Sequence, residues 1–140
     1  MAKMTLELAE ECVRRAKEKA TEMKLTMFIA VVDEVGKLVS FARMGESNIG
    51  FGEKISIAKA KTAVAYKRDT KETMERYANY PGNYFMTGMA GLCPDEFWGG
   101  PGGVPIMIDG QLVGGLGVSG STPENDHKCA TEALASVQKK

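Results

Sequence analysis

The only histidine of the chain, His127, is the side chain best suited to proton transfer or metal binding near neutral pH. It follows Asp126, and both fall in the first turns of a predicted C-terminal helix. The helix dipole there disfavours a protonated imidazole, so His127 is a candidate metal ligand or general base. Asp126 and Glu96 are the candidate acids. The structural alternatives are an exposed polar histidine and an aspartate that complements the helix N-terminus.

Three further side chains are candidates for holding a ligand. Arg43 could pair with a ligand carboxylate, and an ordinary surface salt bridge is the alternative. Lys59 and Thr62 lie near the small-residue face of a predicted helix. Lys59 could act as a nucleophile or Schiff-base lysine only if it is buried, which the sequence does not show.

A glycine-rich segment over residues 99–103 leads directly into a predicted strand. Consecutive backbone N–H groups in such a run can cradle a carboxylate, a propionate or a phosphate. Gly102, Gly103 and Pro105 are therefore candidate ligand-binding residues, and a simple turn of the chain is the alternative. The spacing matches neither the dinucleotide-binding nor the Walker pattern, so we reject a nucleotide fingerprint.

The cysteines are odd in number and widely spaced, at Cys12, Cys93 and Cys129. This pattern favours reduced thiols in a cytoplasm over a disulfide framework. Cys93 and Cys129 could serve as thiolate ligands, but no Cys-x-x-Cys or His/Cys spacing indicates a structural metal. The segment 77–98 is rich in methionine and aromatic residues, which is typical of an apolar lid or an oligomer interface.

The first half of the chain is predicted to form two helices and a hairpin, which carry Arg43, Lys59 and Thr62. Apolar residues at helical spacing predict a helix that ends near residue 24. The segment 25–33 is apolar on both alternating faces, as in a strand covered above and below, and 37–44 is its predicted hairpin partner. A polar loop over 45–52 separates this hairpin from a second helix over 55–68.

In the second half of the chain, the sequence predicts secondary structure weakly at first and clearly towards the C-terminus. A short helix over 72–77 is the only regular element that the sequence predicts between residues 69 and 97. A two-residue Asp109-Gly110 turn predicts a hairpin of strands 104–108 and 111–119. Thr122 then provides the N-cap, and Pro123 the first position, of a helix that runs to about residue 137.

One face of the predicted strand 111–119 carries almost no large side chains. It presents Val113, Gly115, Gly117 and Ser119. A helix, a second chain or a flat ligand can approach such a face closely.

The element order predicts an α+β fold in which an antiparallel sheet is flanked by helices, in three α-β-α layers. A length of 140 residues predicts a single domain over 1–140. Equal numbers of basic and acidic residues, 18 each, argue against nucleic acid as a partner. The sequence has no apolar stretch long enough to span a membrane and no apolar signal-peptide core, so we expect a cytoplasmic protein.

Several motifs together resemble a known family over essentially the whole chain. They are residues 102–106 and 114–120, Asp126 followed by Ala130, Val31-Val32-Asp33 with Gly36, Arg43-Met44, and residues 59–63. The chain is identified as a member of the bacterial family that contains GlcG, the haem-binding protein HbpS and the C-terminal domain of PduO-type adenosyltransferases (DUF336). This resemblance implies a profilin-like antiparallel sheet flanked by helices and a homo-oligomer, a dimer or larger. It implies no single activity.

The leading hypothesis is a binding module for haem or a similar planar, carboxylated ligand, held between the bare strand face, the glycine-rich loop and an apolar surface. His127, a cysteine or a methionine would supply the axial ligand. Haem-binding relatives tend to carry further histidines in the first helix or before the second one, and this sequence has none in either region. One alternative is a cofactor-independent lyase, isomerase or hydrolase that holds a carboxylated metabolite with Arg43 and the loop. The other is an accessory protein of a cobalamin-dependent diol or glycerol dehydratase system.

Overall fold

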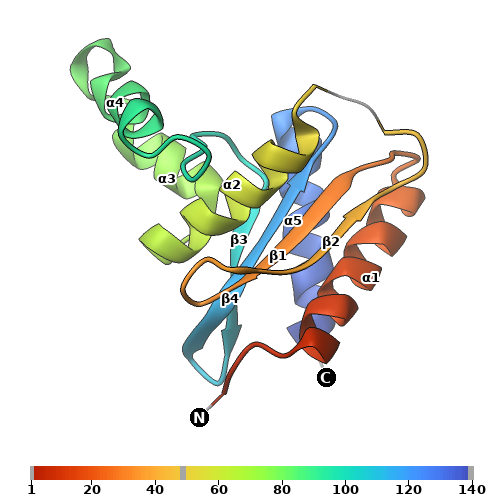
Figure 1. Ribbon diagram of the computed structural model, residues 1–140. Coiled ribbons are helices and arrows are strands. Elements are labelled where there is room, and N and C mark those ends of the chain that lie inside the picture. The colour runs from red at the N-terminus through yellow and green to blue at the C-terminus, as the bar shows by residue number, and fades with distance from the viewer. Residues whose placement is uncertain (1, 48–49, 139–140) are drawn as a thin grey trace.

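The computed structural model describes residues 2–47 and 50–138 (Figure 1). The elements in chain order are α1 (Leu6–Glu22), β1 (Phe28–Asp33), β2 (Leu38–Arg43), α2 (Gly52–Tyr66), α3 (Thr70–Tyr77), η1 (Pro81–Asn83), α4 (Tyr84–Leu92), β3 (Gly103–Ile108), β4 (Gln111–Ser119) and α5 (Pro123–Gln138). The strands form one antiparallel sheet in the order β2-β1-β4-β3. Within the described ranges, no helix is long and apolar enough to cross a membrane.

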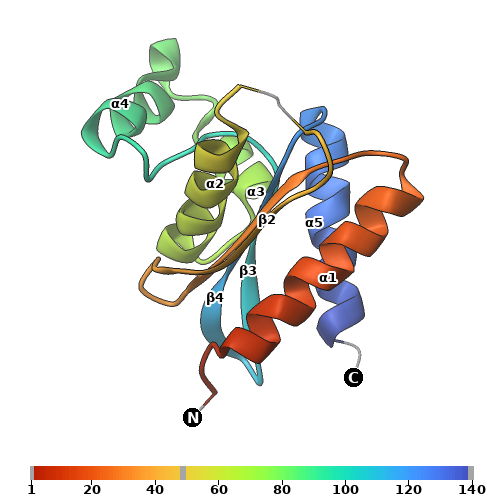
Figure 2. The same ribbon diagram turned by 45° about the vertical axis from the view of Figure 1, so that its right-hand side comes forward.

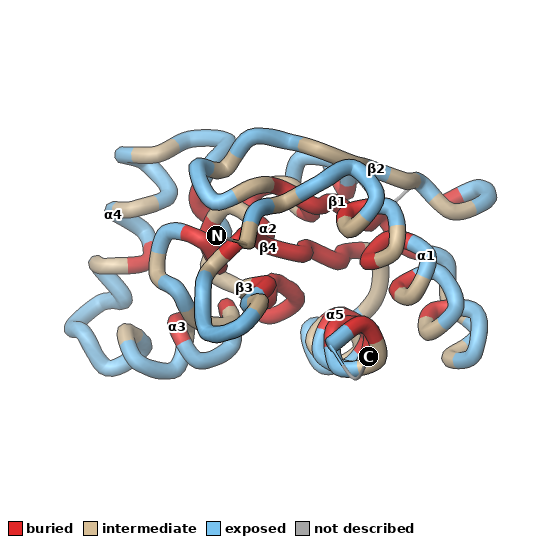
Figure 3. The backbone as a smooth tube through the Cα atoms, turned by 90° about the horizontal axis from the view of Figure 1, so that it is seen from below, coloured by how far each residue is buried: buried red, intermediate tan, exposed pale blue. Residues whose placement is uncertain are grey.

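Helices cover both faces of this sheet (Figure 2). Helices α1 and α5 pack on one face, where Ile29 and Val31 of β1 belong to the main hydrophobic core. Helix α2 covers the other face, where Val32 packs with Ala60 and Val64. Figure 3 shows the buried strands β1 and β4 between the helical layers. The predicted α+β fold with three α-β-α layers is confirmed.

Helix α2 lies so close to β4 that two strand residues have no room for a side chain. A Cβ atom on Gly115 would overlap the backbone oxygen of Ala60, and one on Gly117 would overlap that of Ser56. The bare strand face predicted from the sequence therefore exists, and a helix covers it. The expectation that a flat ligand lies against this face is wrong, because the backbone of α2 fills the space.

Strand β4 changes its alternation near its start, at an irregularity opposite β3. The register passes from Ile106↔Gly114 to Met107↔Leu112, so Val113 is the extra residue of a bulge. Val113 joins the core beneath α1 and α5, whereas Leu112 packs on the α2 side. The predicted placement of Val113 on the glycine face is therefore wrong.

Local interactions set the ends of the first elements. The side chain of Thr5 caps α1 by accepting a hydrogen bond from the backbone N–H of Leu8, at 3.0 Å. Lys24 then turns the chain with a positive φ of 61°, and β1 begins at Phe28 rather than at residue 25. The predicted loop over 45–52 includes residues 48 and 49, which lie outside the described residues.

The segment 69–97 is more helical than the sequence predicts. Asp69 caps α3 by accepting a hydrogen bond from the backbone N–H of Glu72, at 2.9 Å, which confirms a short helix here. The sequence gives no signal for α4, because its residues are apolar without a clear period and include two glycines. Helices α3 and α4 project beyond the sheet (Figure 1), and Tyr84 and Leu92 of α4 are 59% and 76% exposed.

Candidate functional site

Lys59 of α2 and Asp126 of α5 form an ion pair in the interior of the protein. Lys59 Nζ lies 2.8 Å from Asp126 Oδ2, and the two side chains are 4% and 5% exposed. Nζ also donates a hydrogen bond to the backbone oxygen of Val118, 2.8 Å away. Because α2 and α5 cover opposite faces of the sheet, this pair connects the two helical layers at the end of β4.

Two glycines that the sequence suggests for ligand binding instead make room for Lys59, Gly102 for its side chain and Gly103 for its backbone. A Cβ on Gly102 would lie 2.7 Å from Lys59 Nζ, and its φ of 125° is one that side chains rarely adopt. A Cβ on Gly103 would overlap the backbone oxygen of Lys59. The N–H of Gly103 donates to Thr70 Oγ1 at 2.9 Å. The expected anion-binding nest is therefore wrong at Gly103, because its N–H is already committed.

The start of α5 holds Asp126 in a fixed position. Its Oδ1 accepts a hydrogen bond from the backbone N–H of Ser121 at 3.0 Å, while Oδ2 faces Lys59. Thr122 Oγ1 accepts from the N–H of Asn125 at 3.2 Å, as expected of an N-cap. Burial of the ammonium group lowers the pKa of Lys59, and attraction to Asp126 opposes that shift.

A cavity of about 190 Å³ lies beside the ion pair. Its walls come from the start of α2, the glycine-rich loop, the end of β4 and the start of α5. The lining residues include Ile55, Lys59, Trp98, Pro101, Ser121 and Asp126. Lys59, Asp126 and the glycine-rich loop are separate candidates for a functional site in the sequence. In the structure they line one cavity.

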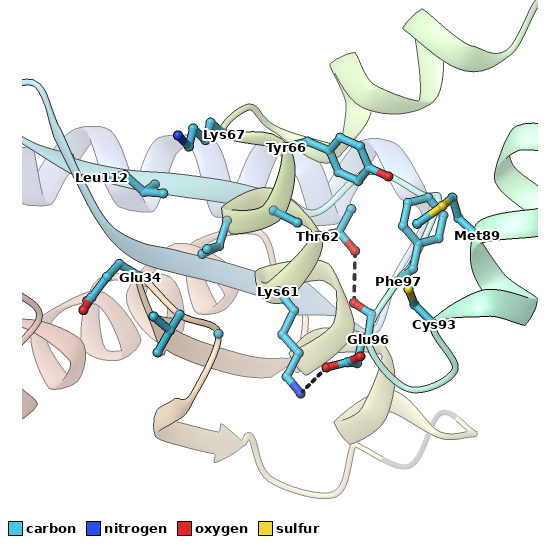
Figure 4. A pocket seen from close by; sticks show the side chains of 14 residues that line it. Glu34, Lys61, Thr62, Tyr66, Lys67, Met89, Cys93, Glu96, Phe97 and Leu112 are labelled. Atoms are coloured by element: carbon cyan, nitrogen blue, oxygen red, sulfur yellow. Dashed lines mark hydrogen bonds and ion pairs between the residues drawn. The ribbon is translucent and has the colours of Figure 1, made fainter.

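A larger cleft of about 410 Å³ lies between α2, the β1–β2 turn and the segment that follows α4. Figure 4 shows Tyr66, Met89, Cys93 and Phe97 gathered on one side of it and Leu112 on the other. The ring of Tyr66 packs edge-on against that of Phe97, with centroids 6.0 Å apart. Burial raises the pKa of Tyr66, so its phenol stays protonated at neutral pH.

Two predicted site residues, Thr62 and Glu96, line this larger cleft rather than the cavity beside the ion pair. Thr62 Oγ1 donates to the backbone oxygen of Ala58 at 2.8 Å and accepts from the N–H of Trp98 at 2.9 Å. Its hydroxyl therefore fixes the segment before β3 to α2. Glu96 is exposed, and its Oε1 lies 4.0 Å from Lys61 Nζ (Figure 4).

Arg43 and Pro105 lie apart from both cavities. Arg43 is exposed at the end of the edge strand β2, whereas the glycine-rich loop enters β3 at the opposite edge of the sheet. The expected arrangement in which Arg43 and the loop hold one carboxylate is therefore wrong within a single chain. Pro105 pairs with Gly115 in the sheet and faces a surface groove beside Leu134 of α5.

His127 lies next to Asp126 in α5 but lines neither cavity. Its Nε2 is 3.5 Å from Thr131 Oγ1, and its buried Nδ1 has no hydrogen-bond partner among the described residues. Over residues 2–47 and 50–138, no cluster of three or more His, Cys, Asp or Glu side chains could hold a metal ion. His127 therefore has no partner ligand within the described part of the chain.

The fold and these two cavities define an α+β protein in which one helix, α2, borders both a small buried site and a larger open cleft. Residues 4–135 match the family described as haem degrading protein HbpS-like. The chain belongs to this HbpS-like family, which confirms the resemblance drawn from its motifs.

Two relatives are similar to nearly the whole chain. An uncharacterized 15.0 kDa protein from the dhaT-dhaS intergenic region of Citrobacter freundii is 30% identical over 135 residues, covering 96% of this chain and 92% of that protein. Protein GlcG of Escherichia coli K12 is 32% identical over 116 residues, covering 83% of this chain and 81% of GlcG.

Solved structures share the fold. The protein ORFY of Klebsiella pneumoniae superposes with a TM-score of 0.88 at 28% identity, covering 100% of this chain and 94% of that one. A PduOC–heme complex superposes with a TM-score of 0.84, also at 28% identity, covering 96% of this chain and 94% of that one.

Proposed function

We propose that this chain, as one domain over residues 1–140, binds a planar, carboxylated small molecule such as haem in the cleft of about 410 Å³. The observation that carries the proposal is the meeting of apolar walls, lysines and sulfur atoms around this one cleft. Val64, Phe97 and Leu112 supply apolar surface. Sites for organic ligands are typically apolar with a few placed polar groups.

Lys61 and Lys67 line the cleft together with Glu34 and Glu96, and the two lysines would pair with the carboxylates of the ligand. Lys61 lies 4.0 Å from Glu96, and the two side chains are 29% and 63% exposed. An ion pair this exposed contributes little to stability, so a ligand carboxylate can displace Glu96 at small cost.

Met89 and Cys93 line the same cleft and offer the soft sulfur donors that hold haem iron in other proteins. The donor set therefore fits haem, whose iron would bring redox chemistry and a strong visible absorption. Since His127 lies outside the cleft, Cys93 or Met89 would hold the iron.

The comparisons support haem as the ligand class. The PduOC–heme complex has the same fold at 28% identity, and the description of the matching family names haem. Haem binding by this chain is therefore part of our proposal.

A haemin titration followed by visible absorption tests the proposal. The wild type is expected to give a saturable shift of the Soret band. Ala65→Trp places an indole in the cleft from the exposed surface of α2 and should weaken binding at least about tenfold, or ~1.4 kcal/mol. Ala135→Trp makes the same change on the exposed surface of α5, against the opposite face of the sheet, and should leave affinity unchanged.

Substitution of the sulfur donors identifies the iron ligand. Cys93→Ser or Met89→Leu should move the Soret maximum of the complex, whereas His127→Ala should not. A wild type without a saturable shift would overturn the proposal. So would binding that Ala65→Trp leaves intact.

We also propose that the chain forms a homo-oligomer, a dimer or larger, through η1 and α4. Tyr80, Tyr84 and Leu92 in this projecting segment are 38%, 59% and 76% exposed (Figure 1). Exposed apolar side chains concentrated on one short segment mark interaction sites. Because Met89 and Cys93 belong to the same segment, association there would cover the open side of the cleft.

We also propose that the protein is cytoplasmic. Cys12, Cys93 and Cys129 are all free thiols, and that compartment keeps cysteines reduced. Cell fractionation that finds the protein outside the cytoplasm would contradict this placement.

A further inference from the structure

We propose that Lys59 is a nucleophilic amine that captures a small uncharged aldehyde or ketone as an imine, in the cavity of about 190 Å³ beside Asp126. This cavity and the larger cleft share no lining residue. Imine formation at Lys59 is therefore independent of planar-ligand binding in the larger cleft.

The geometry brings an amine and a proton-transfer group to one cavity wall. Lys59 Nζ is held at 2.8 Å from both Asp126 Oδ2 and the backbone oxygen of Val118, so its flexible stem has a defined end point. Lys59 and Asp126 both line the cavity. A molecule inside it would contact the amine and the carboxyl group together.

The charge of the site favours a neutral ligand. Lys59 and Asp126 are its only charged lining residues among those described, and they neutralise each other. An anion would add a buried negative charge beside Asp126, which is costly in a low-dielectric interior. A carbonyl compound brings no charge, so it suits this cavity better than the carboxylate that a glycine-rich loop suggests.

The size of the cavity favours a short chain. A volume of about 190 Å³ corresponds to the space of about six water molecules in the liquid. Ile55, Trp98 and Pro101 give it apolar walls for the alkyl part of an aldehyde or ketone.

The reaction balances without an oxidant or reductant. A proton passes from Lys59 Nζ to Asp126, and the nitrogen lone pair forms a bond to the carbonyl carbon. The π electrons of the C=O bond move to oxygen, which takes the proton from Asp126 to give a carbinolamine. The C–O bond then breaks, and Asp126 relays one of the two remaining nitrogen protons to the departing oxygen. The products are the protonated imine and one water, and Asp126 is again a carboxylate.

A second ion-paired lysine provides a natural control for the effect of burial. Lys19 Nζ lies 2.6 Å from Glu132 Oε1 at the protein surface, and hydrogen bonds to Glu132 and Glu22 raise its pKa. Burial acts in the opposite direction on Lys59 and lowers its pKa, which increases the fraction of free amine. Two lysines with similar partners are therefore expected to differ in nucleophilicity.

Reductive trapping tests the proposal. The full chain is incubated with propanal and cyanoborohydride near neutral pH, digested and analysed by mass spectrometry. Each trapped imine adds the mass of propanal less one oxygen. Lys59 should be labelled faster than Lys19, because burial lowers the pKa of Lys59 whereas hydrogen bonds to carboxylates raise that of Lys19. Acetone should slow this labelling by competition, and propionate should not.

The labelling pattern of the wild type tests the proposal even if the variants fold poorly. Labelling of exposed lysines alone, or of Lys59 only after denaturation, would overturn the proposal. Asp126→Asn keeps the size of the side chain and should slow labelling of Lys59, with circular dichroism confirming the fold. An unchanged rate in that variant would overturn the assignment of Asp126 as the proton relay.

Discussion

Lys59 and Asp126 extend from helices on opposite faces of the sheet, and their charged atoms meet 2.8 Å apart. The meeting is possible because Gly102, just before β3, carries no side chain that would occupy the space of Lys59 Nζ. The same two side chains line a cavity, so this ion pair affects both the stability of the fold and the chemistry of the site.

Removal of one partner of this pair should destabilise the protein strongly. Lys59→Met keeps the length of the side chain but leaves a buried aspartate without its cation, at an expected cost of about 3–5 kcal/mol. Urea denaturation measures the loss. The double variant Lys59→Met with Asp126→Leu should lose less than the sum of the single losses, because neither charge then remains buried. Additive losses would show that the ion pair is not coupled.

The contact between α2 and β4 should not tolerate a methyl group. Gly117→Ala places a Cβ against the backbone oxygen of Ser56, so we expect a loss of about 1–3 kcal/mol or more. The control is Gly88→Ala in α4, where the added Cβ would have no described atom within 4 Å apart from its chain neighbours and the backbone of its own helix. That change should stabilise the helix by roughly 0.5–1 kcal/mol. Equal effects of the two substitutions in thermal unfolding would contradict the close approach.

The three cysteines should differ in reactivity. Cys12 and Cys129 are fully buried, and burial raises the pKa of each thiol to about 12, whereas Cys93 is half-buried beside the larger cleft. A thiol reagent should therefore modify Cys93 in the native protein and all three cysteines in denaturant. Rapid native labelling of Cys12 or Cys129 would contradict their burial.

Alkaline pH should destabilise the fold through the same two thiols. The unfolded thiols titrate near their ordinary pKa of 9.0 and the folded ones near about 12. The unfolded chain therefore loses its protons first, and the stabilisation present below pH 9.0 declines as the pH rises towards about 12. Cys129→Ala should lessen this decline relative to its own stability at neutral pH. An equally steep decline in the variant would contradict the role of Cys129.

Self-association should depend on the exposed apolar residues of α4. Sedimentation of the wild type should give a mass above the 15.1 kDa of one chain, and Leu92→Glu should shift it towards one chain. Thr87→Glu adds the same charge at an exposed polar position of α4 and should have a smaller effect. A wild type that sediments as one chain at all concentrations would contradict the proposed oligomer.

Much of this fold follows from local sequence patterns. The Asp109-Gly110 turn, the caps Thr5 and Thr122, and the doubly apolar strand β1 each give a short-range signal that the structure confirms. Helix α4 has no such signal, since its stability derives from aromatic contacts such as the stacked rings of Tyr77 and Phe85, 3.9 Å apart. Contacts of this kind depend on the arrangement of whole elements.

The candidate site was only partly predictable for the same reason. Lys59 and Asp126 both attract attention as single residues, but nothing in the sequence pairs them, because their contact depends on two helices that meet around the end of a strand. Similarly, the glycines of β4 are compatible with either a ligand or a helix as their neighbour. Only the tertiary packing shows that this neighbour is α2. Met89 and Cys93 carry no spacing signal and gain significance from the cleft that they line.

The order of the strands has a consequence for how the chain folds. Each half of the sheet is a hairpin, β1 with β2 and β3 with β4, whose strands lie close together along the chain. The two hairpins become one sheet only when β1 pairs with β4, which joins Phe28 to Ser119. Until that non-local pairing forms, each hairpin has an apolar edge strand that is open to other chains. Folding of this protein is therefore expected to be slowed, and its aggregation governed, by this single strand-to-strand docking step.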